Sequence, residues 1–182
     1  MKALLSFVAI GMMTLPASGI AQDSKKPPEN GELTKAVYWV PNQHCLECAT
    51  ALERSLKKVG GIKSTTVNFS NKLATVEFDE TLISAQEVSV AMFQAPHAMG
   101  ANMKYGGFLM LSVPDAKDKA KQTKATTALG KVEGVAKAVY YPQTKAVAVQ
   151  FGDKGKVTST ELIKALEAAG MKGTLYGATA KK

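Results

Sequence analysis

Cysteine and histidine are scarce in this chain of 182 residues, which contains two of each. So few histidines exclude a multi-histidine metal centre and leave little for a base-assisted nucleophile. The sequence also has no glycine-rich phosphate loop and no Gly-x-Ser-x-Gly turn. The common hydrolase and nucleotide-binding motifs are thus missing, and we expect a protein that is not an enzyme.

Arginine is scarcer still, because Arg54 is the single arginine among 23 basic residues. The formal net charge is +8, yet no basic cluster is interleaved with aromatic residues as in many nucleic-acid-binding proteins. We therefore predict no nucleic-acid partner. The lysines are more typical of a solvated cationic surface.

A long apolar run is also missing, since Ala3–Leu15 is shorter than the roughly 20 residues of a membrane span. That run follows a positively charged start and precedes the small residues of Gly19-Ile20-Ala21, a pattern that predicts a signal peptide over 1–21. The polar, proline-containing segment 22–34 is predicted to be a flexible leader. We expect a periplasmic or secreted protein with no stable membrane insertion after cleavage.

The rest of the chain repeats itself when it is shifted by 73 residues, or by 74 after one added residue. The matched segments are 59–62 with 132–135, 76–78 with 149–151, and 84–88 with 158–162. This self-similarity predicts two copies of one module, over 35–107 and 108–182.

Each copy shows the same alternation of strand and helix patterns. The first predicts strands at 36–40, 62–69, 73–78 and 102–106, a helix through Leu52 and Leu56, and a helix from Ser84 to before Pro96. Ser84 with Glu87, and Thr158 with Glu161, form capping boxes, and the last strand of the second copy is expected at 171–176. The order predicts an α+β fold of two tandem ferredoxin-like βαββαβ sandwiches, each a four-stranded antiparallel sheet with two helices.

Both cysteines stand together in the sequence His44-Cys45-Leu46-Glu47-Cys48, between the first predicted strand and the first predicted helix. Two thiolates at this spacing can converge on one soft ion, and a helix N-terminus is expected to lower the pKa of both thiols. Cu(I) is the first candidate and Hg(II) the second. Zn(II) is the third, because it needs more than two firm ligands.

A βαββαβ module of about seventy residues with this Cys-x-x-Cys position resembles the heavy-metal-associated domain of copper chaperones, metal-pumping ATPases and periplasmic mercury-binding proteins. Members usually read Gly-Met-x-Cys-x-x-Cys, whereas here Asn42 and Gln43 stand at the Gly and Met positions. The family methionine packs under the metal loop, so the resemblance implies that Gln43 affects loop rigidity and metal preference. In the second copy, Asp118 and Lys121 replace the cysteines, and we expect no metal there.

Further candidate ligands come from the loop before the last strand of the first copy. In a ferredoxin-like unit the first and last strands are neighbours, so this loop should lie beside the cysteines. It contains His97, Met99 and Met103. These residues, together with His44, are candidates for a third ligand or for shielding the ion from water.

Two alternatives use the same cysteines without a metal. A Cys-x-x-Cys pair after a strand is also the arrangement of thiol-disulfide oxidoreductases, although the predicted strand order differs from theirs. A structural disulfide in an interaction module is the other alternative, but so short a loop constrains the unfolded chain little. The favoured hypothesis is a metal carrier whose partners are the ion and a metal-transporting or metal-accepting protein.

Overall fold

A computed structural model describes residues 33–177 of the chain. The predicted signal peptide and nearly all of the predicted leader lie outside these residues. Between residues 33 and 177, none of the helices is both long enough and apolar enough to cross a membrane.

The structure alternates strands and helices in the order that the sequence predicted, up to the end of the second helix. The strands are β1 (Thr34–Trp39), β2 (Ile62–Asn68), β3 (Leu73–Phe78), β4 (Phe108–Ser112), β5 (Val135–Tyr141), β6 (Ala146–Phe151) and β7 (Thr174–Leu175). The helices are α1 (Leu46–Leu56), α2 (Ala85–Gln94), α3 (Lys119–Gly130) and α4 (Ser159–Ala168). The chain thus has an α+β fold, as predicted.

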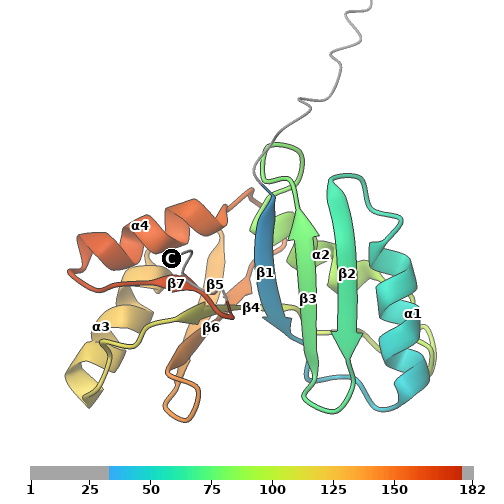
Figure 1. The fold of residues 1–182 in the computed structure, drawn as a ribbon, viewed down its shortest axis with the longest axis horizontal. Coiled ribbons are helices and arrows are strands. Elements are labelled where there is room, and N and C mark those ends of the chain that lie inside the picture. Colours follow the sequence, from blue (N-terminus) through green and yellow to red (C-terminus); the bar gives the residue numbers. More distant parts are fainter. Residues whose placement is uncertain (1–32, 178–182) are drawn as a thin grey trace, which may run out of the picture.

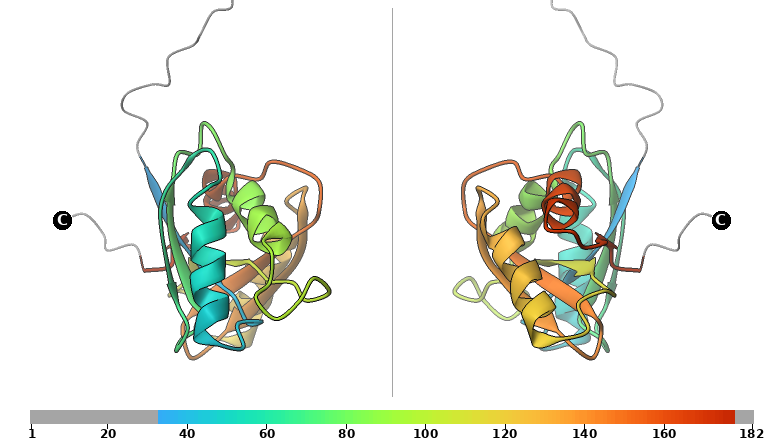
Figure 2. Two further views of the ribbon diagram at one scale, coloured as in Figure 1. Left: turned by 90° about the vertical axis from the view of Figure 1, so that its right-hand side faces the viewer. Right: turned by 90° about the vertical axis from the view of Figure 1, so that its left-hand side faces the viewer.

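The strands form one antiparallel sheet in the order β2-β3-β1-β4-β6-β5, with β7 also paired to β4. We predicted two separate four-stranded sheets, and the single seven-stranded sheet corrects that expectation. In Figure 1 the sheet runs through the whole molecule, with α1 and α2 on the half that contains β1 to β3 and α3 and α4 on the other half. Figure 2 shows each helix pair from its own end of the molecule.

Strand β4 connects the two halves. Its first residues pair with β1, through Tyr38 opposite Leu109 and Trp39 opposite Phe108. Along its other edge it pairs with β6, and Leu111 and Ser112 pair with β7. The strand predicted at 102–106 does not form, because the place beside β1 is taken by this more apolar segment, which buries Leu109 and Leu111 completely.

The four helices of residues 33–177 share one hydrophobic core on one face of the sheet. Alternate strand residues such as Tyr38, Val76, Leu109 and Val149 point into this core and are fully buried, as the period of two along a strand requires. The opposite face carries a smaller cluster. It consists of Met110, Ala146 and Ala148 with the partly buried residues Trp39, Phe108, Tyr141 and Tyr176.

Helix starts follow the sequence closely. The predicted capping boxes of Ser84 with Glu87 and of Thr158 with Glu161 are both confirmed. The carboxylate of Glu80, in the loop before α2, accepts hydrogen bonds from the backbone N–H and the hydroxyl of Ser159 at the start of α4. This contact joins the loop before α2 in one half to the start of α4 in the other.

Candidate metal centre

Cys45 and Cys48 lie at the start of α1, directly after the loop that leaves β1. Cys45 is the N-cap residue with extended backbone (φ −151°), and its Sγ accepts the N–H of Cys48 at 3.3 Å. A side-chain acceptor at the N-cap satisfies one of the free N–H groups of the first turn. The helix start therefore orients both thiols toward each other.

The two sulfur atoms are 2.7 Å apart and share a hydrogen bond, and both thiols are free. Cys48 is fully buried and Cys45 is half-buried. One sulfur is thus open to an incoming ion while the other faces the protein interior. Loss of both thiol protons would leave two thiolates able to bind a single soft cation.

The pKa of the Cys45 thiol is raised above its ordinary value, mainly because its side chain hydrogen-bonds to Cys48. The backbone N–H groups of Cys48 and Glu47 act in the opposite direction. Our sequence-based expectation of a lowered pKa is therefore wrong for Cys45 in the metal-free protein. The neighbouring thiol, which that expectation left out, outweighs the helix N-terminus.

Three side-chain hydrogen bonds tie the segment that carries the cysteines to distant parts of the chain. Asn42 Nδ2 donates to the carbonyl of Lys104 (3.0 Å), and Lys72 Nζ donates to the carbonyl of Pro41 (3.3 Å). The fully buried Tyr105 donates its hydroxyl proton to the carbonyl of Cys48 (2.9 Å). The segment is thus anchored before Cys45 and again at Cys48.

His97 lies beside the loop, as predicted, and is buried. Its Nδ1 accepts the N–H of Met99 (3.2 Å), so the proton is assigned to Nε2, which donates to the carbonyl of Asn42 (3.1 Å). Its ring also lies against Tyr105, with centroids 4.4 Å apart. Both nitrogens of His97 therefore hold backbone groups in this structure.

The remaining predicted ligands are more exposed. His44 is exposed, with its ring centroid 6.0 Å from that of His97. Met99 is also exposed, and Met103 is half-buried. Among residues 33–177 no group of three or more His, Cys, Asp or Glu side chains is arranged to hold a metal. The two thiols are the donors that the structure brings together.

Sequence reasoning overlooked one contributor and understated another. Nothing in the sequence signalled that Tyr105 would reach the first turn of α1. Gln43 stood out by its position two residues before Cys45, but its complete burial was not predicted. A polar residue where the family pattern has methionine was the available signal.

At the corresponding place in the second half, α3 begins with an ordinary cap. Asp118 is the N-cap residue, and its carboxylate accepts the N–H of Lys121 at 2.8 Å. Cys45 makes the same capping contact with sulfur. The second half thus keeps the helix start and has no thiol at it.

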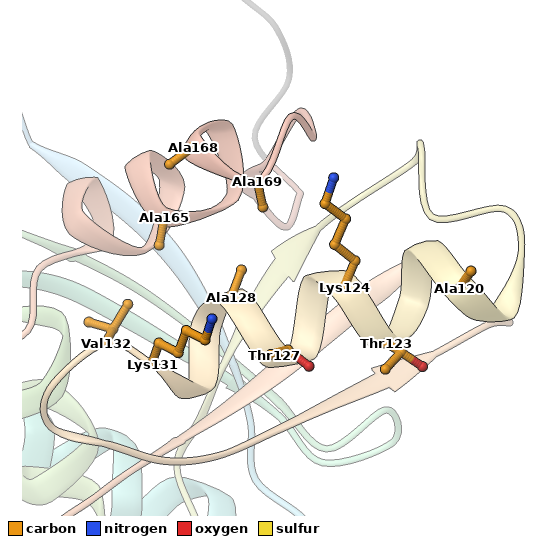
Figure 3. A pocket seen from close by; sticks show the side chains of 10 residues that line it. All are labelled: Ala120, Thr123, Lys124, Thr127, Ala128, Lys131, Val132, Ala165, Ala168 and Ala169. Atoms are coloured by element: carbon orange, nitrogen blue, oxygen red, sulfur yellow. The ribbon is translucent and has the colours of Figure 1, made fainter.

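An open groove of about 690 Å³ lies between α3 and α4, away from the cysteines. Figure 3 shows Ala128 of α3 and Ala165 of α4 facing the space between the helices, with Lys124 and Lys131 beside it. None of the predicted ligands lines this groove.

Two free thiols lie together at the start of the first helix of an α+β unit. Residues 37–90, which include both cysteines, match the heavy-metal-associated domain. This segment of the chain is therefore a heavy-metal-associated domain.

Curated relatives match the same part of the chain. The mercuric transport protein periplasmic component of Shewanella putrefaciens is 34% identical over 56 residues, which cover 31% of this chain and 62% of the relative. The protein of the same description from Shigella flexneri gives the same values. The chain thus spans about three fifths of the length of these relatives.

Two solved structures are also similar. The water-soluble region of the P-type ATPase CopA from Bacillus subtilis is 20% identical, with 84% of this chain and 99% of that chain covered and a TM-score of 0.40. Oxidized MerP from Ralstonia metallidurans CH34 is 23% identical, with 41% and 96% covered and a TM-score of 0.34.

Proposed function

We propose that this chain is a non-catalytic, exported metal-binding protein that captures one soft ion between Cys45 and Cys48 and either buffers it or passes it to another carrier. The observation that supports this most is the pair of free thiols 2.7 Å apart inside a heavy-metal-associated domain. A half-exposed Cys45 beside a buried Cys48 suits transfer by ligand exchange, because an incoming thiolate can attack from the open side.

Cu(I) is the ion that we favour. Two sulfur ligands suit a soft monovalent cation that accepts low coordination numbers. Zn(II) usually takes four protein ligands, and the thiol pair supplies two. His97, His44, Met99 and Met103 stay candidates for an additional ligand, with His97 requiring release of its two backbone partners.

Hg(II) is the second candidate, and a specific observation favours it. The curated relatives are described as periplasmic components of mercuric transport. The same description supports an exported location and a metal-transporting partner. Hg(II) and Cu(I) compete for the same two thiolates, so both ions are tested on one site.

We further propose that residues 108–177 are a second copy of the module that has no metal site. β5 and β6 begin 73 residues after β2 and β3, and α4 begins 74 residues after α2. Both β2 and β5 carry an irregularity at their start, between Ile62 and Ser64 and between Val135 and Lys137. Lys72 and Lys145 also share a left-handed backbone in the turns that follow.

The test is metal stoichiometry and X-ray absorption on reduced protein loaded anaerobically with Cu(I), and separately with Hg(II). We expect one tightly bound ion with two sulfur neighbours, which the Cys45→Ser, Cys48→Ser double variant loses. The matched control is an Asp118→Ser, Lys121→Ser double variant at the corresponding cap of the second half, which should bind normally.

If the reduced protein binds neither ion more tightly than the cysteine variant, the metal function is wrong. The reduction potential of the dithiol then tests the oxidoreductase alternative. Competition between the two ions for the loaded site decides which one is preferred.

A further inference from the structure

Gln43 is a buried polar residue of the metal loop with unmet hydrogen-bonding capacity. Its side chain is 0% exposed, and neither Nε2 nor Oε1 has a hydrogen-bond partner. Such groups are uncommon in folded proteins, because a buried amide without partners loses its bonds to water and gains nothing in return. The free-energy cost of burying this amide without partners suggests that Gln43 has a role beyond packing.

Gln86 shows what the fold normally does with a buried glutamine. It is also 0% exposed, but its Nε2 donates to the carbonyls of Gly152 and Lys154 (2.8 and 2.9 Å) and its Oε1 accepts the N–H of Val157 (3.1 Å). Among residues 33–177, the buried side-chain atoms without a partner belong to Gln43, two residues before Cys45, and to Thr65, whose Oγ1 lies in β2.

The buried thiol of Cys48 also lacks hydrogen-bond donors from the rest of the described part of the protein. In this structure the one hydrogen-bond partner found for Cys48 Sγ within residues 33–177 is Cys45 Sγ. Cys45 Sγ, in contrast, also accepts a backbone N–H. When a metal displaces the protons, the contact between the thiols is lost, and Cys48 becomes a fully buried, metal-bound thiolate without a donor.

Gln43 lies five residues before Cys48 in the segment that carries the site. Both side chains are fully buried, whereas His44, Leu46 and Glu47 between them are exposed. A neutral amide donor stabilises an anionic sulfur through a charge-assisted hydrogen bond. It does so without adding a positive charge that would compete with the cation.

We propose that Gln43 is a positioning residue for the bound metal, whose Nε2 donates a hydrogen bond to the Cys48 thiolate in the loaded protein. This inference rests on the proposed function and adds a residue that sets the affinity of the same site. Nε2 has no partner in this structure and gains one when it donates to the Cys48 thiolate, so metal binding relieves part of the cost of burying the amide.

The decisive variant is Gln43→Leu, which keeps a similar volume but has no donor and no sulfur that could itself bind Cu(I). Removing an unpaired buried amide should leave the metal-free protein at least as stable as the wild type. Removing a second-sphere donor should weaken Cu(I) binding by about 10-fold to 100-fold. These opposite effects separate the proposed role from a purely structural one, which would lower both stability and affinity.

The experiment measures Cu(I) affinity by competition with a chromogenic chelator and stability by urea unfolding of the metal-free protein. It compares the wild type, Gln43→Leu, and the Cys45→Ser, Cys48→Ser variant. The NMR signal of the Gln43 side-chain amide in the wild type is a second readout. On Cu(I) loading we expect its protons to shift and to exchange more slowly with solvent.

Unchanged Cu(I) affinity in Gln43→Leu, with affinity lost in the cysteine variant, would overturn the role of Gln43 while leaving the proposed function intact. If the wild type binds no better than the cysteine variant, both proposals fail. Should Gln43→Leu not fold, an amide signal that is unaffected by loading of the wild type would overturn the inference.

Discussion

Gln86 and Val157 exchange two hydrogen bonds across the boundary between the two halves of the molecule. The N–H of Gln86 donates to the carbonyl of Val157, and the N–H of Val157 donates to Gln86 Oε1, both at 3.1 Å. The Gln86 side chain thus makes the backbone hydrogen bonds that a neighbouring strand would otherwise make to the loop between β6 and α4. Two glycines make room for it, since a Cβ at Gly134 or Gly155 would lie 2.9 or 2.6 Å from Gln86 Oε1.

Replacing Gln86 with alanine should destabilise the whole described fold. The change leaves two carbonyls and one N–H without partners, which at typical costs amounts to ~3 kcal/mol of unfolding free energy. Urea unfolding measures this loss. The matched control is Gln94→Ala at the exposed end of the same helix, where we expect a change within about 0.5 kcal/mol. Equal effects of the two changes would show that the Gln86 contacts contribute little.

The capping box of α2 predicts a pH-dependent stability. The pKa of Glu87 is lowered, first because its carboxylate accepts the N–H of Ser84. A carboxylate with a lower pKa in the folded chain stabilises it fully above its unfolded value, near 4.5, and loses this contribution as the pH falls through the folded value. Glu87→Gln keeps the cap without the charge.

We therefore expect the wild type to be more stable than Glu87→Gln at neutral pH, with the difference shrinking as the pH falls below about 4.5. Thermal unfolding of both proteins at pH values from about 3 to about 7, which bracket the titration of a carboxyl group, measures this difference in stability. Glu167→Gln on the exposed surface of α4 serves as the control. A difference that does not change with pH would contradict the expectation.

Two hairpin turns offer a matched pair of glycine substitutions. Lys72 and Lys145 have positive φ angles of 57° and 51°, a region that costs a non-glycine residue about 1–2 kcal/mol. Lys145→Gly should therefore raise the unfolding free energy by up to ~1 kcal/mol. Lys72→Gly should gain less, because it also loses the bond from Nζ to the carbonyl of Pro41. Equal gains would mean that this bond contributes nothing.

The role of His97 can be tested by His97→Phe, which keeps a ring against Tyr105 and removes both nitrogens. If the histidine holds the loop and is not a ligand, X-ray absorption should show the same two sulfur neighbours of Cu(I) in the variant as in the wild type, with no nitrogen neighbour in either. Loss of two partly buried hydrogen bonds should cost ~2 kcal/mol in the metal-free protein. A nitrogen neighbour in the wild type that is missing from the variant would instead make His97 a ligand.

Local signals in the sequence predicted most individual elements. The capping box of Ser84 with Glu87 predicted the start of α2, and the spacing of apolar residues predicted β3 at its observed bounds. The strand expected at 102–106 failed because strand pairing is decided by competition between segments distant in sequence. Phe108–Ser112 is more apolar and buries more surface beside β1.

For the site, too, the sequence predicted which residues come together but not their detailed contacts. The sequence was sufficient to pair Cys45 with Cys48 and to bring His97 to the loop. It could not show that both His97 nitrogens would be occupied by backbone groups, or that the Cys45 thiol would have a raised pKa, because both depend on contacts of a few ångströms. The burial of Gln43 likewise depends on three-dimensional packing.

The position of β4 has a consequence for how this protein can be divided. Because the strand beside the end of β1 begins after residue 107, a chain cut there would retain both cysteines and lose the neighbour that pairs with Tyr38 and Trp39. A half-length fragment would expose that edge to pairing with other chains. The cysteine-free half is thus a covalently attached partner of the cysteine-containing half, and each molecule that carries the thiols also carries the strand that pairs with β1.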